Sequence, residues 1–302
     1  MISSSLNLGS ETETIGQCII CADSNIFCDN RFKALLGLIH PYGVKKCSKC
    51  GLRWLSPRPT EKGYCELYKF ETYFEGQNAV ESYATLAIKR RNYFIKRLCR
   101  IEKIAAMPFS LKILDIGAAT GEFVYEAVKR GHYAVGLEIS EGAREKARKQ
   151  YNIDLIEGNI WDLPKTDLFD VVHMNHVLEH FPNPAKELSF AYRLLKKGGM
   201  LVVEVPQQFE NDLDRIRRLL HISKGSTFNN YSIHHTYFFS PATLVRLLDK
   251  QNFSVISLNT ANPHLTPLKP FNLKNLFLRI LLQTADKVHK GGNIIEAYAK
   301  KT

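Results

Sequence analysis

Four cysteines near the start of the chain are spaced in a way that suits a metal ion. Cys18 and Cys21 form one C-x-x-C pair, Cys47 and Cys50 form a second, and 25 residues separate the two pairs. Two such pairs supply the four thiolates of a tetrahedral zinc site, which leaves no open position for a substrate. A short loop-rich segment buries too little apolar surface to fold alone, and a bound metal stabilises it. The spacing therefore predicts a structural Zn²⁺ in a module at 17–59.

A second group of residues is suited to hold a cofactor. The stretch "LDIGAATG" at 114–121 has the pattern of a buried strand that runs into a glycine turn and then into a helix. Backbone N–H groups at such a turn surround a bound ligand. The dinucleotide fingerprint G-x-G-x-x-G is not met, because Ala119 replaces its middle glycine and Asp115 stands where an apolar residue is usual. The pattern thus disfavours a nicotinamide cofactor.

The same stretch resembles motif I of class I S-adenosylmethionine-dependent methyltransferases, D-x-G-x-G-x-G, with Ala119 at the middle glycine. The resemblance covers about residues 111–302. It implies an enzyme with a Rossmann-like α/β fold, whose sheet has seven mostly parallel strands. It also implies that the turn wraps the methionine part of the cofactor while Asp115 supports the turn. The alternative for Asp115 is a cap on the following turn.

Two further strand ends fit the same cofactor. Glu138 ends the second predicted strand, where an acid can accept hydrogen bonds from both ribose hydroxyls. Asn159 follows the third strand, where the family usually has an aspartate that contacts the adenine. The cofactor-binding residues that the resemblance implies are Asp115, Gly117, Ala118, Ala119, Gly121, Phe123, Glu138, Ile139, Asn159, Ile160, Asn175 and His176.

Histidines mark the expected acceptor side. The stretch "NHVLEHFPNP" at 175–184 resembles H-x-L-E-H-x-x-x-P of a large subgroup of these enzymes, and 231–244 resembles a second acceptor-side segment of that subgroup. In sugar C-methyltransferases the second segment reads roughly Tyr-His-Glu-His, and here only the last histidine matches, which weakens a carbon-methylating assignment. A histidine is the natural base near neutral pH. We predict His235 as the acceptor-side base, with His180 and His234 as further catalytic candidates.

A second metal ion is an open alternative at the first of these segments. His176, Glu179 and His180 stand three and four residues apart, so they share one face if the turn is helical. They resemble residues that hold a metal in some ubiquinone-type O-methyltransferases. The other interpretation is that Glu179 and His180 cap and orient the turn.

Strands and helices must alternate to position these residues. Helical patterns of about a dozen residues separate short apolar runs, which predicts βαβ units and a mostly parallel sheet covered on both faces. The last strand is expected at or near an edge. The predicted strands are 112–117, 133–140, 153–159, 169–175, 200–206, 254–258 and 293–301. The helices predicted between them are 121–131, 140–151, 183–199 and 241–253.

The chain divides into four predicted segments. A polar stretch rich in Ser, Thr and Glu predicts a flexible N-terminus. A helical pattern from Thr60 to about Met107, ended by Pro108, separates the cysteine pairs from the sheet. The segments are a flexible N-terminus at 1–16, the zinc-binding module at 17–59, a helical linker or lid at 60–110 and the methyltransferase domain at 111–302.

Composition limits the partners. The net charge of +11 admits an anionic partner, but the basic residues are scattered in the manner of solvated helix faces, which disfavours a nucleic-acid interface without excluding it. No apolar run reaches the ~20 residues that span a bilayer. The first residues lack the pattern of a signal peptide, so a cytoplasmic location is expected.

The order of zinc module, linker and core resembles bacterial methyltransferases that act on deoxysugars and on polysaccharide or natural-product precursors. We therefore predict methyl transfer to a small hydroxylated acceptor, such as a nucleotide-linked sugar, whose diphosphate the positive charge would suit. The alternatives are an RNA methyltransferase and a quinone-type O-methyltransferase, the latter because the amphipathic stretch 271–290 could touch a membrane. A binding protein without turnover is disfavoured by the intact motif residues Asp115, Gly117, Gly121 and Glu138.

Overall fold

The computed structural model describes most of the chain. Between 66 and 90, the backbone of two helices is described in part, but their side chains are not. The described residues are 11–31, 41–69, 79–106, 110–163, 168–208, 211, 235–261 and 291–302. The helices are α2 (Glu61–Lys69), α4 (Ala79–Ala105), α5 (Glu122–Lys129), α6 (Glu141–Tyr151), the 3₁₀ helix η1 (Ile160–Asp162), α7 (Pro184–Leu194) and α9 (Pro241–Lys250). His234 and the amphipathic stretch 271–290 lie outside the described residues.

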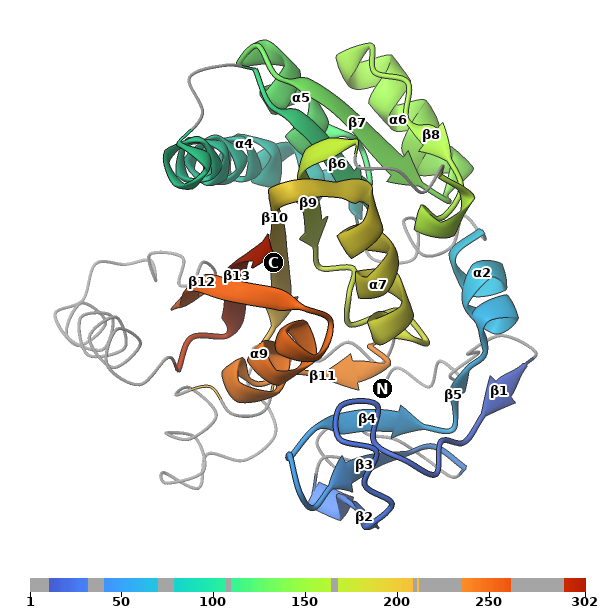
Figure 1. The fold of residues 1–302 in the computed structure, drawn as a ribbon. Coiled ribbons are helices and arrows are strands. Elements are labelled where there is room, and N and C mark those ends of the chain that lie inside the picture. The colour runs from blue at the N-terminus through green and yellow to red at the C-terminus, as the bar shows by residue number, and fades with distance from the viewer. Residues whose placement is uncertain are drawn as a thin grey trace, which may run out of the picture.

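One large sheet forms the centre of the molecule (Figure 1). Its strands are β6 (Lys112–Ile116), β7 (Tyr133–Glu138), β8 (Ile156–Glu157), β9 (Phe169–Asn175), β10 (Leu195–Pro206), β12 (Phe253–Ala261) and β13 (Ile294–Lys301). Their order across the sheet is β12-β13-β10-β9-β6-β7-β8. The five strands from β6 to β10 pair in parallel, whereas β13 runs antiparallel to both β10 and β12. The seven-stranded, mostly parallel α/β sheet predicted from the sequence is confirmed.

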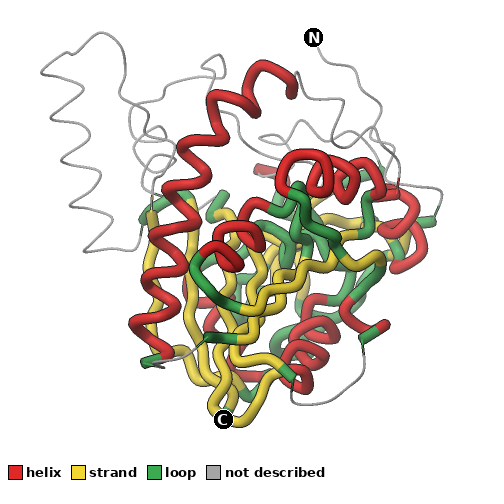
Figure 2. Tube along the Cα trace, turned by 90° about the horizontal axis from the view of Figure 1, so that it is seen from above, coloured by secondary structure: helices red, strands yellow, loops and turns green. Residues whose placement is uncertain are grey.

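Alternating side chains of the central strands enter two separate cores. On β6, Ile113 packs with α4 and α5, whereas Leu114 and Ile116 pack in the core of the opposite face, which contains residues of α7 and α9. Figure 2 shows the long helix α4 along one face of the sheet. Because both faces are covered, the strands are buried almost throughout, which explains their nearly continuous apolar sequence.

Local sequence signals set the helix ends, with one exception. The Ser140 hydroxyl accepts from the Ala143 N–H at 3.3 Å and begins α6 as predicted. The predicted helix 183–199 ends earlier, at Leu194. Leu195 is fully buried and pairs with Phe169 in the sheet, so tertiary packing outweighs the helical pattern there.

A smaller sheet joins the N-terminal segment to the core. Its strands are β2 (Ile26–Cys28), β3 (Gly43–Cys47), β4 (Arg53–Ser56) and β11 (Tyr237–Phe238), in the order β11-β4-β3-β2. β11 belongs to the C-terminal half of the chain, yet it pairs antiparallel with β4 beside α9 (Figure 1). The Leu55 N–H also donates to the Thr236 carbonyl at 2.9 Å. The cysteine-bearing segment and the core are therefore parts of one hydrogen-bonded structure.

Part of the segment predicted to be flexible takes part in pairing. β1 (Thr12–Glu13) lies antiparallel to β5 (Arg58–Pro59). The Glu13 carboxylate accepts from Arg58 at 2.8 Å, and the Glu11 carbonyl accepts from the Thr60 N–H at 3.1 Å. The division of the chain at 16, 59 and 110 remains a prediction, and these contacts cross two of its boundaries.

Arg97 fixes α4 to the sheet through a buried ion cluster. Its guanidinium, only 1% exposed, forms ion pairs with Glu204 on β10 and with Glu296 on β13. It also donates to Asn175 Oδ1 at 2.7 Å, at the end of β9. Burial alone would raise the pKa of Glu204, but Arg97 and His176 outweigh it and lower that pKa to about 2. The linker helix is thus held by charge at the ends of three strands.

We expect Arg97→Met to lower the free energy of unfolding by about 3–5 kcal/mol, because the buried Glu204 carboxylate would lose its ion pair with Arg97 and Asn175 would lose a hydrogen bond. The measurement is urea denaturation, compared with Lys103→Met at an exposed position of the same helix. A loss for Arg97→Met no larger than for Lys103→Met would show that the cluster does not hold the helix.

Candidate cofactor, acceptor and metal sites

A pocket of about 260 Å³ opens at the carboxyl ends of the central strands. Here β6 connects to β7 on one side, and β9, its neighbour, connects to β10 on the other side. Open α/β sheets bind ligands where the strand order reverses in this way. Of the twelve predicted cofactor-binding residues, all except Gly121 line the pocket. The pocket also receives Tyr64 from α2 and Phe94 from α4, which the sequence did not predict. The structure thus brings the predicted residues together, and their contact with the cofactor stays a prediction.

The turn after β6 has an unusual backbone. Gly117, Ala119 and Gly121 all adopt left-handed conformations, with φ values of 69°, 48° and 80°. A Cβ atom at Gly117 would lie 2.8 Å from Cγ2 of Val177, so glycine is required there for space as well as for conformation. Ala119 adopts the left-handed conformation without a glycine, which costs about 1–2 kcal/mol. The N–H groups of the turn are thereby set at one end of the pocket.

Glu138 fastens this turn to the end of β7. One carboxylate oxygen accepts from the Ala119 N–H at 2.9 Å, and the other accepts from the Ser140 N–H at 2.9 Å. Burial raises the pKa of Glu138 above its usual range. Each carboxylate oxygen has a further lone pair, so the side chain can still accept hydrogen bonds from a ligand in the pocket.

Asp115 is held by a buried histidine. Its carboxylate lies 2.7 Å from His173 Nδ1, and His173 Nε2 lies 3.2 Å from an Arg97 guanidinium nitrogen. Because arginine can only donate, His173 carries its proton on Nδ1 and donates to Asp115. The Phe123 ring stacks on His173 with 3.8 Å between centroids. Sequence reasoning missed His173 and Arg97, although a histidine within the apolar run 169–175 was a usable signal.

Asn159 lies at the end of the pocket formed by the loop after β8. The Asp162 carboxylate accepts from the Asn159 N–H at 2.8 Å and begins η1. Gly158 precedes it with a φ of 131°, and a Cβ atom there would lie 3.0 Å from the Asp162 carboxylate. The tight turn leaves Asn159 and Ile160 on the pocket wall.

Four ionisable side chains gather beside the pocket, on the predicted acceptor side. His180 lines the pocket, and its ring meets the His235 ring edge-on at 4.6 Å between centroids. The Glu179 carboxylate lies between them, 3.8 Å from His180 Nε2 and 3.9 Å from His235 Nε2. His176 approaches the same carboxylate at 3.5 Å through Nδ1. The predicted catalytic residues His180 and His235 are therefore neighbours.

His176 differs from the other two histidines. Its Nε2 lies 3.0 Å from the Glu204 carboxylate, and its φ is 53°, a strained value for a histidine. Burial alone would lower the pKa of His176, but hydrogen bonds to Glu179 and Glu204 raise it to about 10. The two carboxylates thus favour the protonated form of His176, whose side chain is 37% exposed and lines the pocket.

Main-chain hydrogen bonds hold this cluster together. The Glu179 carbonyl accepts from the N–H groups of Thr236 and Tyr237 at 2.9 and 3.0 Å. The Thr236 hydroxyl donates to the His180 carbonyl at 3.0 Å. Since β11 is also paired with β4, the segment that holds His235 contacts both the turn with Glu179 and the N-terminal segment.

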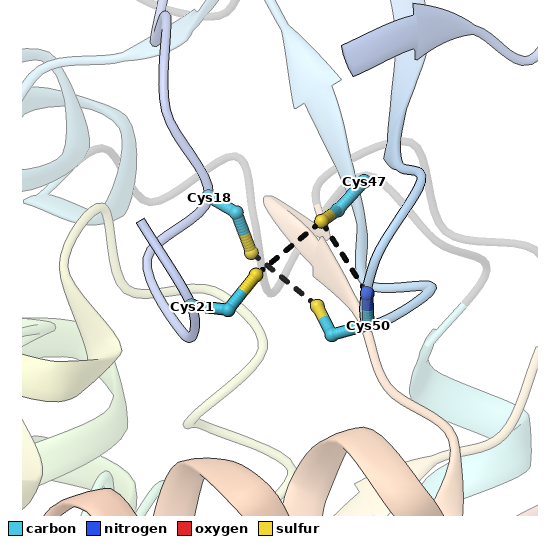
Figure 3. Close-up of side chains that lie close together, drawn as sticks. All are labelled: Cys18, Cys21, Cys47 and Cys50. Carbon is cyan, nitrogen blue, oxygen red and sulfur yellow. Dashed lines mark hydrogen bonds between the residues drawn. The ribbon is translucent and has the colours of Figure 1, made fainter. Parts of the chain in front are cut away.

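The four predicted zinc ligands converge from two loops (Figure 3). All four sulfur atoms lie within 4.8 Å of one another, with Cys18 and Cys50 at 3.4 Å and Cys21 and Cys47 at 3.5 Å. The thiols are free rather than disulfide-bonded. Tetrahedral thiolates at about 2.3 Å from Zn²⁺ lie about 3.8 Å apart, so the four residues fit this metal. When bound, zinc would crosslink the two loops.

Comparisons with known proteins place this site in a family. The sequence pattern of the family described as "Methyltransferase domain" matches residues 81–258. The chain belongs to this family, and it is an S-adenosylmethionine-dependent methyltransferase. None of the described helices is long and apolar enough to cross a bilayer.

Similar curated proteins include two enzymes of quinone biosynthesis. A ubiquinone biosynthesis O-methyltransferase of Vibrio atlanticus (strain LGP32) is 27% identical over 53% of this chain and 69% of its own length. A ubiquinone/menaquinone biosynthesis C-methyltransferase of Rhizobium meliloti (strain 1021) is 35% identical over 30% of this chain and 40% of its own length.

Among solved structures, a Thermotoga maritima SAM-dependent methyltransferase, described as a possible histamine N-methyltransferase, superposes with a TM-score of 0.50 and 24% identity. It covers 76% of this chain and 98% of its own. This likeness shows the fold alone.

We expect Glu138→Ala to weaken cofactor binding by about 1.5–3 kcal/mol, the range for hydrogen bonds that involve a charged group. The variant loses both the bonds that fasten the turn and the predicted ribose acceptor. Calorimetric titration with S-adenosylmethionine measures the effect, and Glu141→Ala, at an exposed position three residues on, is the control. Unchanged affinity in Glu138→Ala would remove this residue from the cofactor site.

We expect Cys47→Ser to lose one zinc ion per chain and most turnover, while cofactor affinity is largely retained. Loosening the cysteine cluster should disturb β4 and, through it, β11. Elemental analysis and cofactor titration are the measurements. Cys28→Ser is the matched control, because the exposed Cys28 thiol lies beside Lys45 and outside the cluster. Wild-type protein without zinc would contradict the prediction. A folded Cys47→Ser variant without cofactor affinity would show that the module is part of the cofactor site.

Proposed function

We propose that the protein methylates a small hydroxylated acceptor, such as a nucleotide-linked sugar or a related saccharide or natural-product precursor. The observation that carries the proposal is the cluster of Glu179, His180 and His235 beside the cofactor pocket. Such a cluster suits an acceptor that must lose a proton from oxygen as the methyl group arrives. The net charge of +11 suits an acceptor that carries a diphosphate.

In this proposal, residues on one side of the pocket bind the cofactor, and residues on the other side bind the acceptor. The predicted cofactor, when bound, supplies an electrophilic methyl group on a sulfonium. The turn at 117–121 and Glu138 orient the cofactor, and alignment of the acceptor with the methyl group supplies much of the rate. His180 and His235 lie on the other side, where the acceptor hydroxyl would give up its proton.

A quinol is the second candidate acceptor, because two similar curated proteins act in quinone biosynthesis. The chain matches them over 53% and 30% of its length, so their acceptors do not transfer to it directly. A panel of nucleotide sugars, simple saccharides and quinols, assayed with methyl-labelled cofactor, separates the two candidates. Labelling of a quinol in preference to every sugar would replace the proposed acceptor class.

We expect His235→Ala to lower kcat by about 10²–10⁴-fold while the cofactor affinity stays unchanged, because the imidazole lies on the acceptor side only. Steady-state kinetics with the acceptor found in the panel measure this effect. His180→Ala provides the comparison within the same cluster. Full turnover in His235→Ala together with loss in His180→Ala would show that His180 is the main catalytic histidine.

A further inference from the structure

His173 of β9 lies beside Asp115 of β6, and its side chain is completely buried at the base of the pocket. We propose that His173 is a positioning residue of the cofactor site, which holds the Asp115 carboxylate toward the ammonium group of S-adenosylmethionine. The inference rests on the cofactor of the family and on the predicted place of Asp115 in its site. It does not depend on the identity of the acceptor.

The sheet itself brings the two residues together. β6 and β9 are parallel neighbours, and Asp115 and His173 are partners in their register. Because side chains alternate along a strand, both residues point to the same face as Ile113 and Val171, which is the face that α4 and α5 cover. The 2.7 Å contact between His173 Nδ1 and Asp115 Oδ1 therefore joins two regular strands and depends on no loop.

Arg97 determines which nitrogen of His173 carries the proton. Its guanidinium lies 3.2 Å from Nε2 and can only donate, so Nε2 accepts and Nδ1 is left to donate to Asp115. A doubly protonated ring would direct a second N–H group at the guanidinium. The contacts thus favour a neutral His173, which gives Asp115 a hydrogen bond without cancelling its charge.

Packing fixes the plane of the His173 ring. The Phe123 ring stacks on it with 3.8 Å between centroids and 18° between planes. Phe94 of α4 in turn meets Phe123 edge-on at 5.7 Å. The stack sets the plane, while Arg97 and Asp115 at opposite nitrogens set which edge of the ring faces each of them. His173 therefore has one orientation, and it passes this orientation on to the carboxylate.

The place of Asp115 in the sheet indicates which part of the cofactor it would face. The predicted ribose contact Glu138 ends β7, and the predicted adenine contact Asn159 follows β8, the next strand outward. Asp115 is on β6, on the side of β7 away from β8, and it also lines the pocket. The amino-acid end of the cofactor would thus lie beside Asp115, where a carboxylate can pair with its ammonium group.

Three substitutions distinguish a hydrogen-bond donor from a side chain that only fills space. The amide of His173→Asn falls near the position of Nδ1 and can donate to Asp115, whereas the amide of His173→Gln falls near Nε2 and can accept from Arg97. His173→Leu does neither. We expect His173→Asn to bind the cofactor within about threefold of wild type, and the other two to bind about tenfold or more weakly, the effect of a lost hydrogen bond to a charged group. A space-filling role predicts the opposite order, because glutamine is larger than asparagine.

The measurements are calorimetric titrations of the full-length protein with S-adenosylmethionine, S-adenosylhomocysteine and 5′-methylthioadenosine. The first two ligands carry the ammonium group, and the third lacks it. His173→Leu should weaken binding of the first two and leave the third unchanged, whereas equal weakening of all three would overturn the proposal. His132→Leu is the control, because this half-buried histidine pairs with Glu102 at 3.0 Å near the amino end of β7 and should leave every affinity unchanged.

A double-variant comparison tests whether His173 acts through Asp115. Asp115→Asn should weaken binding of the two ammonium-bearing ligands, and adding His173→Leu to it should cause little further loss. Additive losses, or unchanged affinity in Asp115→Asn, would overturn the proposal. Urea denaturation of every variant shows whether affinity follows stability, as it would if the histidine were only structural.

The wild-type protein provides a test that needs no variant. With ¹⁵N labelling and assignment from the backbone, the His173 ring should give the signals of a neutral imidazole protonated on Nδ1. Signals of an imidazolium, or of a ring protonated on Nε2 alone, would overturn the proposal. The proposed function is judged separately, since these experiments contain no acceptor and the acceptor panel contains no His173 variant.

Discussion

The predicted acceptor side of this protein is held together by a few main-chain hydrogen bonds between distant parts of the chain. β11 begins two residues after His235, and it is held between β4 of the N-terminal segment and the carbonyl group of Glu179. Main-chain bonds fix direction and register, which side-chain packing alone does not. If zinc binds the cysteines, its stabilising effect reaches the histidines through this pairing. The N-terminal segment would then help to position the histidines, although it contains none of the predicted catalytic residues.

A chain of buried charges links the linker helix with the pocket. Arg97 on α4 contacts Glu204, which in turn holds His176, and the same guanidinium approaches His173, which holds Asp115. Each of these groups would be costly to bury alone, so the cluster is stable only when complete. The helix that covers this part of the sheet is therefore linked through these contacts to both Asp115 at the end of β6 and His176 on the pocket wall.

The sequence predicted most of the residues that line the pocket, because its signals there are local. Asp115, Gly117 and Glu138 each lie at or near the end of an apolar strand, and parallel strands bring their carboxyl ends to one edge. The acceptor side could not be predicted in this way. The contact of Glu179 with His235 joins residues 56 positions apart, and no periodic pattern encodes it. The end of α7 was missed for a related reason, since burial of the next residue in the sheet outweighs helix propensity.

The same contrast between local and long-range contacts explains why membership of the family does not identify the methyl acceptor. The family pattern begins at residue 81, so it includes the strands and turns that carry most of the predicted cofactor-binding residues but not β4, which pairs with β11. Tyr64, which lines the pocket, lies outside the matched region. β11, close to His235, lies inside that region but pairs with β4, which lies outside it. Proteins that share 81–258 can therefore share the cofactor and still present different surfaces to the acceptor. We accordingly expect the choice of acceptor to depend on the contacts between the N-terminal segment and the turn at 176–182. A comparison restricted to the matched region does not include these contacts.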